Sequence, residues 1–429
     1  MSETLDKNVL ENSTKQKNHT GPFLIMVGLM FIVGFLTVVN QQFQAPLQEA
    51  LLSEAGGIKN TLATFITFAF FMGYPTMGNI ASSWVDKKGH KTTLIYGLIM
   101  LVVALGIEAL SAKFAHLPSI EVTGGSHVPQ AFFIFILGSY ALGCALAVLQ
   151  TVINPFLAVC QVPGTSSVTR LSIAGAANSI GTTIAPIFVA SIIFGGMAPK
   201  VAQILLPLAI LMVVVGSVAV VLGKLELPNP MASDDEEESN VTTDLTKSVW
   251  SFKHLTLGVV AIFVYVGAEV AVGSNIVLHA KQIGIEKETY ALMAMLYWGS
   301  MLVGRLFGSV LAKVPGQTQL LVTSVVALVL TIAGMATEQL WLLVGIGLMH
   351  SIMWGAIFAL AIDKLGPYTA KGSGALMIGV AGGAILPWVQ GVSADALGSW
   401  QETWFIVVLC EAYLIYYALI GYKPQESAE

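Results

Sequence analysis

Uncharged amides stand in the middle of some of the most apolar stretches of this chain. Gln150 and Asn154 lie four residues apart within YALGCALAVLQTVINPFLA (140–158), so a helix places both on one face. Pro155 follows directly and removes a backbone donor from that helix. Because hydrocarbon penalises amides that lack partners, this face should turn to a polar cavity or to a neighbouring helix. The pattern predicts one wall of a pathway for a solute.

Further polar and aromatic residues fall near the middle of other apolar stretches. Amides and carboxylates can pair with hydroxyl groups, and aromatic faces can lie against C–H groups, which is the chemistry that binding a sugar requires. The candidates are Asn40, Gln41 and Asn178 in the first part of the chain and Glu269, Asn275, Trp298, His350 and Trp354 in the second. His350 and Trp354 repeat the spacing of Gln150 and Asn154, 200 residues later, which predicts that the two pairs face each other.

Each candidate also has a structural interpretation. Asn154 can hold the weakened helix turn at Pro155, and Asn178 can join two helices through a hydrogen bond. The tryptophans can be packing residues, and His350 can be a buried structural histidine.

The composition is that of an integral membrane protein. Of 429 residues, 55% are hydrophobic and 10% are charged, and the mean hydropathy is +0.78. Soluble proteins carry about 25% charged residues. The net charge of −5 comes largely from one acidic loop, so it does not indicate nucleic-acid binding. Three cysteines, all in apolar stretches, indicate no disulfide framework.

Twelve apolar segments are each long enough to cross a bilayer, and they predict an all-α membrane protein with both termini in the cytoplasm. The segments are 22–46, 60–83, 92–111, 130–158, 171–194, 201–222, 254–278, 289–312, 318–336, 339–362, 372–393 and 402–421. In this topology five of the 20 lysines and arginines fall outside, at Lys59, Lys113, Lys200, Lys281 and Lys287, which leaves 15 inside. The positive-inside rule favours this orientation in the cell membrane.

The segments form two related sets of six. A tail (1–21), a first bundle (22–222), an acidic linker (223–253), a second bundle (254–421) and a short tail (422–429) describe the expected organisation. Residues 70–83 align with 296–309, and 181–186 align with 382–387. Such repeats predict a transporter architecture with the solute site between the two halves, near the middle of the membrane.

The loop after the second segment, SSWVDKKGHK (82–91), predicts a tight cytoplasmic turn. An acid, a glycine and clustered lysines suit a short hairpin beside anionic headgroups. The spacing resembles the G-x-x-x-D-[RK]-x-G-[RK]-[RK] loop of the major facilitator superfamily, with Ser82 and His90 as departures. The resemblance implies that Asp86 and Gly89 act as a conformational latch, and we place Arg170 and Arg305 in the same class.

Several motifs together resemble one branch of that superfamily, the fucose–galactose–glucose:proton symporters. They are QTVINPF (150–156), RLSI (170–173), NSIGTTIAP (178–186), EVAVGS (269–274), YWG (297–299) and GGAILP (382–387). The resemblance covers about residues 22–421 and implies uptake of a hexose by alternating access, without a metal or a cofactor. Gln41 and Gln150 stand where fucose members carry acids, which favours the glucose/galactose type.

Proton coupling needs a carboxylate whose charge can change inside the membrane. Glu269 is the best candidate, because Glu108 lies toward an outer end and Glu411 lies on the last segment, which in the fold implied by the resemblance usually faces lipid or packing partners. Two alternatives to proton symport are a facilitator mechanism and symport with another ion. An exporter would favour a more aromatic cavity, an enzyme a clustered nucleophile or metal set, and a sugar sensor an added signalling domain.

Overall fold

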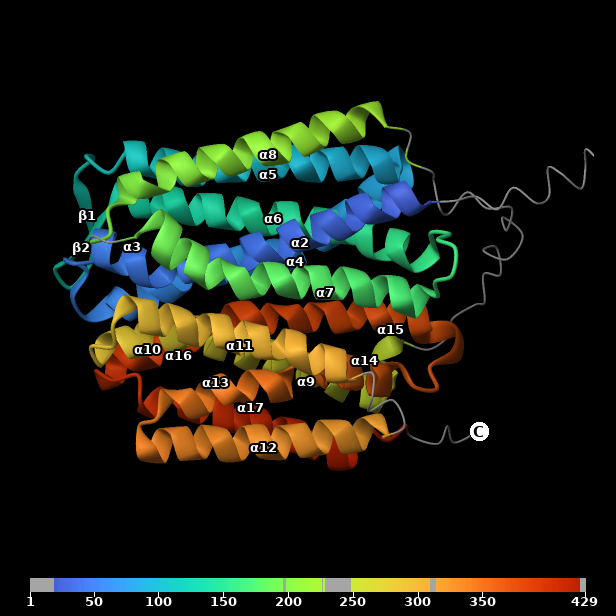
Figure 1. Cartoon of the computed structure of the whole chain (residues 1–429). Helices are drawn as coiled ribbons and strands as arrows, with labels where there is room; N and C mark the ends of the chain where they lie inside the picture. The colour runs from blue at the N-terminus through green and yellow to red at the C-terminus, as the bar shows by residue number, and fades with distance from the viewer. Residues whose placement is uncertain (1–18, 196–197, 226, 228–247, 309–313, 425–429) are drawn as a thin grey trace, which may run out of the picture.

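The computed structural model of the chain describes residues 19–195, 198–225, 227, 248–308 and 314–424, which form an almost entirely helical molecule (Figure 1). Its first half comprises α2 (Thr20–Gln42), α3 (Gln44–Leu51), η1 (Gly56–Ile58), α4 (Lys59–Lys88), α5 (His90–Lys113), β1 (Ser119–Thr123), β2 (Ser126–Pro129), α6 (Gln130–Val159), α7 (Ser167–Ile187), η2 (Phe188–Ile193), η3 (Val201–Ile204) and α8 (Leu205–Lys224). The acidic run 234–238 and most of both predicted tails lie outside the described residues.

The second half begins after the linker. It comprises η4 (Val249–Ser251), α9 (Lys253–Val270), η5 (Ala271–Asn275), α10 (Ile276–Gln282), α11 (Lys287–Gly308), α12 (Gly316–Thr337), α13 (Leu340–His350), α14 (Met353–Ile362), η7 (Gly366–Tyr368), α15 (Thr369–Leu376), η8 (Met377–Ala381), α16 (Gly382–Leu397), η9 (Glu402–Trp404), α17 (Phe405–Tyr416) and η10 (Tyr417–Gly421).

The described helices account for the twelve predicted crossings. Ten are long and apolar enough to span a membrane, and the pair α13–α14, bent by 42°, makes an eleventh. The twelfth is α4, whose 30 residues reach about 45 Å, longer than a hydrocarbon core of ~30 Å. It packs against α6 of its own half and α16 of the other, and Asn60, Thr64 and Thr67 in its first part are buried against protein.

A short β-hairpin interrupts the helices between α5 and α6. Strands β1 and β2 pair antiparallel, with Ser119 opposite Pro129. Gly124 and Gly125 both have positive φ, at 53° and 79°, as the tight turn between two strands requires. This hairpin lies at one end of the molecule, at the left of Figure 1, which we name the hairpin end.

The two halves lie side by side and repeat each other's packing (Figure 1). A Cβ on Gly181 of α7 would overlap the Phe31 carbonyl of α2, and a Cβ on Gly382 of α16 would overlap the Phe263 carbonyl of α9. These two glycines are the ones that the sequence repeat aligns. In both halves the fifth crossing helix therefore approaches the first at the same glycine, which confirms the pseudo-symmetric pair of six-helix bundles.

The halves are joined mainly at the hairpin end. Asp395 of α16 accepts from the backbone N–H groups of Asn60 (3.1 Å) and Thr61 (2.6 Å), at the start of α4. Lys281 pairs with Glu49 at 3.2 Å, and Lys287 donates to the Phe194 carbonyl. The Thr61 hydroxyl also donates to Asp395, and Lys281 also donates to the Ala45 carbonyl at 3.0 Å. Further hydrogen bonds across the boundary join Gln42 to Gly273 and, farther from this end, Arg305 to Ser179. The described state is therefore closed at the hairpin end.

Candidate functional site

A polar cluster lies on the first half near the middle of its helices. Gln150 of α6 donates from Nε2 to the Tyr74 hydroxyl of α4 at 2.8 Å, and Thr37 of α2 interacts with the same phenol. Tyr74 stacks on Phe71, whose ring lies against Gly383 of α16. Since Gly383 belongs to the other half, the cluster borders the boundary. Gln150 is half-buried there and keeps its amide oxygen for a further partner.

Gln41 is the least satisfied side chain near this cluster. It is 1% exposed, and neither its amide oxygen nor its amide nitrogen has a hydrogen-bond partner. It lies one helical turn beyond Thr37 on the same face of α2, toward the hairpin end. A buried amide without partners costs about 1–3 kcal/mol, so this position suits a polar ligand that can satisfy both atoms.

The second half presents Glu269 and Trp298 at a matching depth. Gln42 of α2 donates to the Gly273 carbonyl at 3.1 Å, and this contact sets the register of the two halves. Because α2 and α9 run in the same direction, Glu269 lies one turn before Gly273, opposite the level of Thr37 and Gln41. Trp298 of α11 packs on Gly273 and has a buried indole N–H without a partner.

Two further tryptophans belong to the second half, and one of them, Trp388, meets the first half. Trp354 of α14 is half-buried, with its ring 6.3 Å from that of Tyr265. Trp388 of α16 lies 5.3 Å from Phe68 of α4, and its indole N–H also lacks a partner. Sequence reasoning missed Tyr74 and Trp388, although both lie in or beside motifs that it aligned, because nothing in the sequence shows which face of a helix meets the other half.

Several predicted site residues have protein partners instead. Asn40 donates to Glu108 and Ser139, both at 2.9 Å, inside the first half. Asn178 donates to the Met30 carbonyl at 3.1 Å, which joins α7 to α2. Asn275 donates to the Pro387 carbonyl and to Gln390. Asn154 is exposed near the end of α6, away from the hairpin end.

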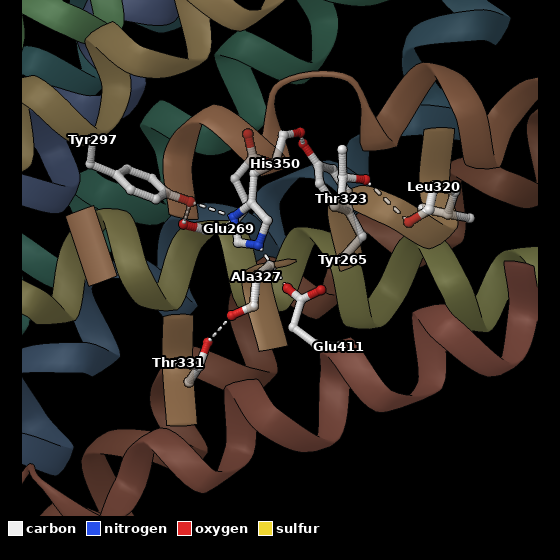
Figure 2. Close-up of polar contacts among 9 residues, drawn as sticks. All are labelled: Tyr265, Glu269, Tyr297, Leu320, Thr323, Ala327, Thr331, His350 and Glu411. Carbon is white, nitrogen blue, oxygen red and sulfur yellow. Dashed lines mark hydrogen bonds and ion pairs between the residues drawn. The ribbon is translucent and has the colours of Figure 1, made fainter. Parts of the chain in front are cut away.

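The predicted pairing of two facing walls is wrong for His350. This residue is 0% exposed at the end of α13, where the helix breaks, and its imidazole lies between Tyr297 (2.7 Å) and Glu411 (2.8 Å). Figure 2 shows that its ring points into the second half, toward α17. The break after His350 turns α14 by 42° from α13, so the spacing of His350 and Trp354 does not place them on one continuous face.

The predicted latch residues lie away from the hairpin end. Gly89 has a φ of 80° between α4 and α5, which favours glycine, and Asp86 is exposed beside it. Arg170 donates to the carbonyls of Leu157 and Ala158, so it caps the end of α6. Arg305 donates to the Ser179 hydroxyl across the boundary at 2.6 Å.

Away from the hairpin end, the boundary thus combines amide, phenol and indole groups with the Glu269 carboxylate beside them. Such groups bind a polyhydroxylated solute through hydrogen bonds and ring stacking. The described residues contain no cluster of histidine, cysteine, aspartate or glutamate that could hold a metal ion.

Comparison with known proteins decides the family. A sequence profile described as Major Facilitator Superfamily matches residues 30–387. The chain belongs to the major facilitator superfamily. A putative glucose/galactose transporter of Helicobacter pylori is 30% identical over 94% of this chain and 97% of its own length. A glucose/galactose transporter of Brucella abortus is 28% identical over 96% of both chains.

Solved structures agree on the fold. The crystal structure of the Escherichia coli fucose:proton symporter matches 94% of this chain and 99% of its own, with a TM-score of 0.64 at 22% identity. This major facilitator protein is therefore a multi-pass membrane transporter and not an enzyme.

Proposed function

We propose that this protein imports a hexose of the glucose/galactose type by alternating access, coupled to protons. The observation that carries the proposal is the buried, unpartnered amide of Gln41, next to Gln42, which donates across the boundary between two halves that are closed at one end. The names of its relatives and the sequence motifs support the class of solute.

The orientation follows from the charge count. Of the 20 lysines and arginines, the 15 assigned to the cytoplasmic side include the latch-loop lysines, on the side away from the hairpin end. In the inner membrane of a bacterium, the hairpin end then faces outward and both termini face the cytoplasm. The described state is accordingly closed toward the outside.

Sugar recognition is assigned to polar and aromatic groups at or beside the boundary between the halves. Gln41 and Gln150 pair with hydroxyl groups, and Trp298 contributes an indole N–H together with an aromatic face. Trp388 extends this surface where α16 meets α4. Trp354 stays a candidate on the second half. Asn40, Asn178 and Asn275 hold the helices that carry these groups, because their amides already have partners within the protein.

Glu269 is assigned to proton coupling beside this boundary. It is half-buried, and the charges that act on it are those of Arg305 and of protonated His350. Protonation would neutralise the Glu269 carboxylate, and we assign this protonation to the step in which the proton and the sugar bind. We expect Glu269→Gln to lose uphill accumulation and to retain exchange of labelled for unlabelled sugar. Normal accumulation by this variant would remove Glu269 from the coupling step.

The deciding experiment is uptake of labelled sugars by proteoliposomes containing the purified protein. A panel of unlabelled hexoses as competitors, repeated at several external pH values, identifies both the sugar and the driving ion. We expect saturable uptake of glucose or galactose that a proton gradient drives uphill. Flux without accumulation would indicate a facilitator, and the absence of saturable flux with every hexose would refute the proposal.

A further inference from the structure

A buried acid–base pair lies inside the second half (Figure 2). His350 Nε2 and Glu411 Oε1 are 2.8 Å apart, and both side chains are 0% exposed. The second carboxyl oxygen, Oε2 of Glu411, has no hydrogen-bond partner. An uncompensated negative charge on this oxygen is costly in a dry bundle, so the surroundings favour a pair that holds a proton and has no net charge.

A hydrogen-bond chain connects the pair to the backbone of α9. The Tyr297 hydroxyl lies 2.7 Å from His350 Nδ1 and 2.9 Å from the Glu269 carbonyl oxygen. A carbonyl only accepts, so Tyr297 uses its single proton to donate to Glu269. Nδ1 must then carry a hydrogen and donate to the Tyr297 oxygen. One further proton lies between Nε2 and Glu411, which makes the pair neutral.

Loss of that proton forces a rearrangement. With hydrogen on Nδ1 alone, Nε2 and the Glu411 carboxylate would be two acceptors at hydrogen-bond distance. The imidazole therefore moves its hydrogen to Nε2, where it donates to Glu411. Nδ1 becomes an acceptor, and Tyr297 turns its proton toward it. The Glu269 carbonyl then loses its donor.

We propose that His350 and Glu411 form a proton-binding site and that Tyr297 transmits its occupancy to α9. The affected carbonyl lies one turn before Gly273, which accepts from Gln42 of the other half. Occupancy of the site thus stabilises the α9 backbone at the boundary, and loss of the proton weakens it. The role in transport rests on the proposed proton coupling, whereas the site and its relay do not depend on the sugar.

Other ionisable groups lie around the His350–Glu411 pair. They are Tyr265 and Glu269 on α9, Tyr297 and Arg305 on α11, and Cys410 on α17. The facing part of α12 contributes hydroxyl groups, of which Thr323 and Thr331 are bonded to carbonyls of their own helix. Tyr265 donates to the His350 carbonyl at 2.9 Å and so holds the broken end of α13.

The test measures how often the halves separate at the hairpin end, by means of a reporter cysteine that replaces Thr64. Thr64 is 0% exposed and packs against Gly391 of α16, so a thiol there reacts with maleimide only when the halves separate. The three native cysteines are at most 5% exposed and give little background. Labelling rates are compared with those of the same reporter carrying Glu411→Gln at each pH, which cancels the pH dependence of the thiolate itself.

The amide that Glu411→Gln introduces can donate to Nε2 of His350 and imitates the occupied site at every pH. In acidic buffer we expect the Thr64→Cys reporter to be labelled at the same rate with and without Glu411→Gln. In alkaline buffer the reporter with native Glu411 should be labelled about two- to tenfold faster, as loss of one hydrogen bond predicts. A rate ratio that stays constant with pH would overturn the proposal. Glu108→Gln is the matched control, since this buried carboxyl has neutral partners in the first half, and its ratio to the reporter alone should stay constant.

A second variant keeps the test decisive if Glu411→Gln fails to fold. Tyr297→Phe leaves the His350–Glu411 pair intact but removes the hydroxyl group that connects it to the Glu269 carbonyl. The ratio of the labelling rate of the reporter with Tyr297→Phe to that of the reporter alone should therefore change with pH. Proton-driven sugar accumulation by Glu411→Gln vesicles completes the test, and we expect accumulation to be lost while exchange persists. Accumulation equal to that of the unsubstituted protein would overturn the coupling role. Absence of any sugar flux in the unsubstituted protein would instead count against the proposed function.

Discussion

Asp395 offers the sharpest perturbation of the closed end. Its carboxylate accepts three hydrogen bonds from the first turn of α4, from the N–H groups of Asn60 and Thr61 and from the Thr61 hydroxyl (2.7 Å). It therefore caps a helix of the opposite half, and this cap exists only while the halves are together. Substitution by alanine should destabilise the closed state and leave the open state unchanged.

The magnitude follows from the contacts. Losing a helix N-cap costs about 0.5–2 kcal/mol, and a hydrogen bond to a charged group contributes about 1.5–3 kcal/mol. Asp395 is only half-buried, so solvent screens part of this. We expect Asp395→Ala to shift the closed–open equilibrium by about 1–3 kcal/mol, or roughly 5- to 150-fold.

The assay is maleimide labelling of the Thr64→Cys reporter in the absence of sugar. Labelling of the Asp395→Ala variant should rise by the factor given above, provided that opening limits the rate. Asp395→Asn is the matched variant, because it keeps one acceptor oxygen where the carboxylate uses two. Its labelling rate should therefore lie between those of the unsubstituted protein and Asp395→Ala. Equal labelling of all three proteins would refute the argument that this cap holds the halves together.

Two further predictions concern the site and the repeat. Gln150→Ala should weaken sugar binding by about 1 kcal/mol, roughly fivefold in Kd, and unchanged affinity in a binding titration would place Gln150 outside the site. Gly181→Ala and Gly382→Ala should each lower thermal stability by about 1–3 kcal/mol, because a Cβ at either position would overlap a backbone carbonyl. Gly175→Ala is the control on α7, since nothing lies within 4 Å of a Cβ there. Melting temperatures of the purified proteins measure these effects, and equal losses for all three would contradict the close-approach argument.

The sequence was a good guide to the helices and a poorer guide to their side-chain partners. Hydropathy predicted the crossings, and the aligned glycines 181 and 382 predicted the repeat, because lipid and close helix contact restrict residue type locally. Gln150 was correctly expected to find a polar partner. The spacing of His350 and Trp354 misled, because a helix break at 351–352 is not visible in an apolar sequence.

What the sequence alone determined was the number of crossings, their pairing into two related halves and the family of transporters. The number of crossings follows from the thickness of the bilayer and from the cost of polar groups in it, because both constrain each segment separately. The pairing into halves and the family follow from residues that recur at matching places in the sequence. Only the tertiary structure decided that Asn40 binds Glu108, that His350 binds Glu411 and that Asp395 caps α4. These partners lie 61 to 335 residues apart, and helical periodicity gives the direction of a side chain but not the helix that it meets.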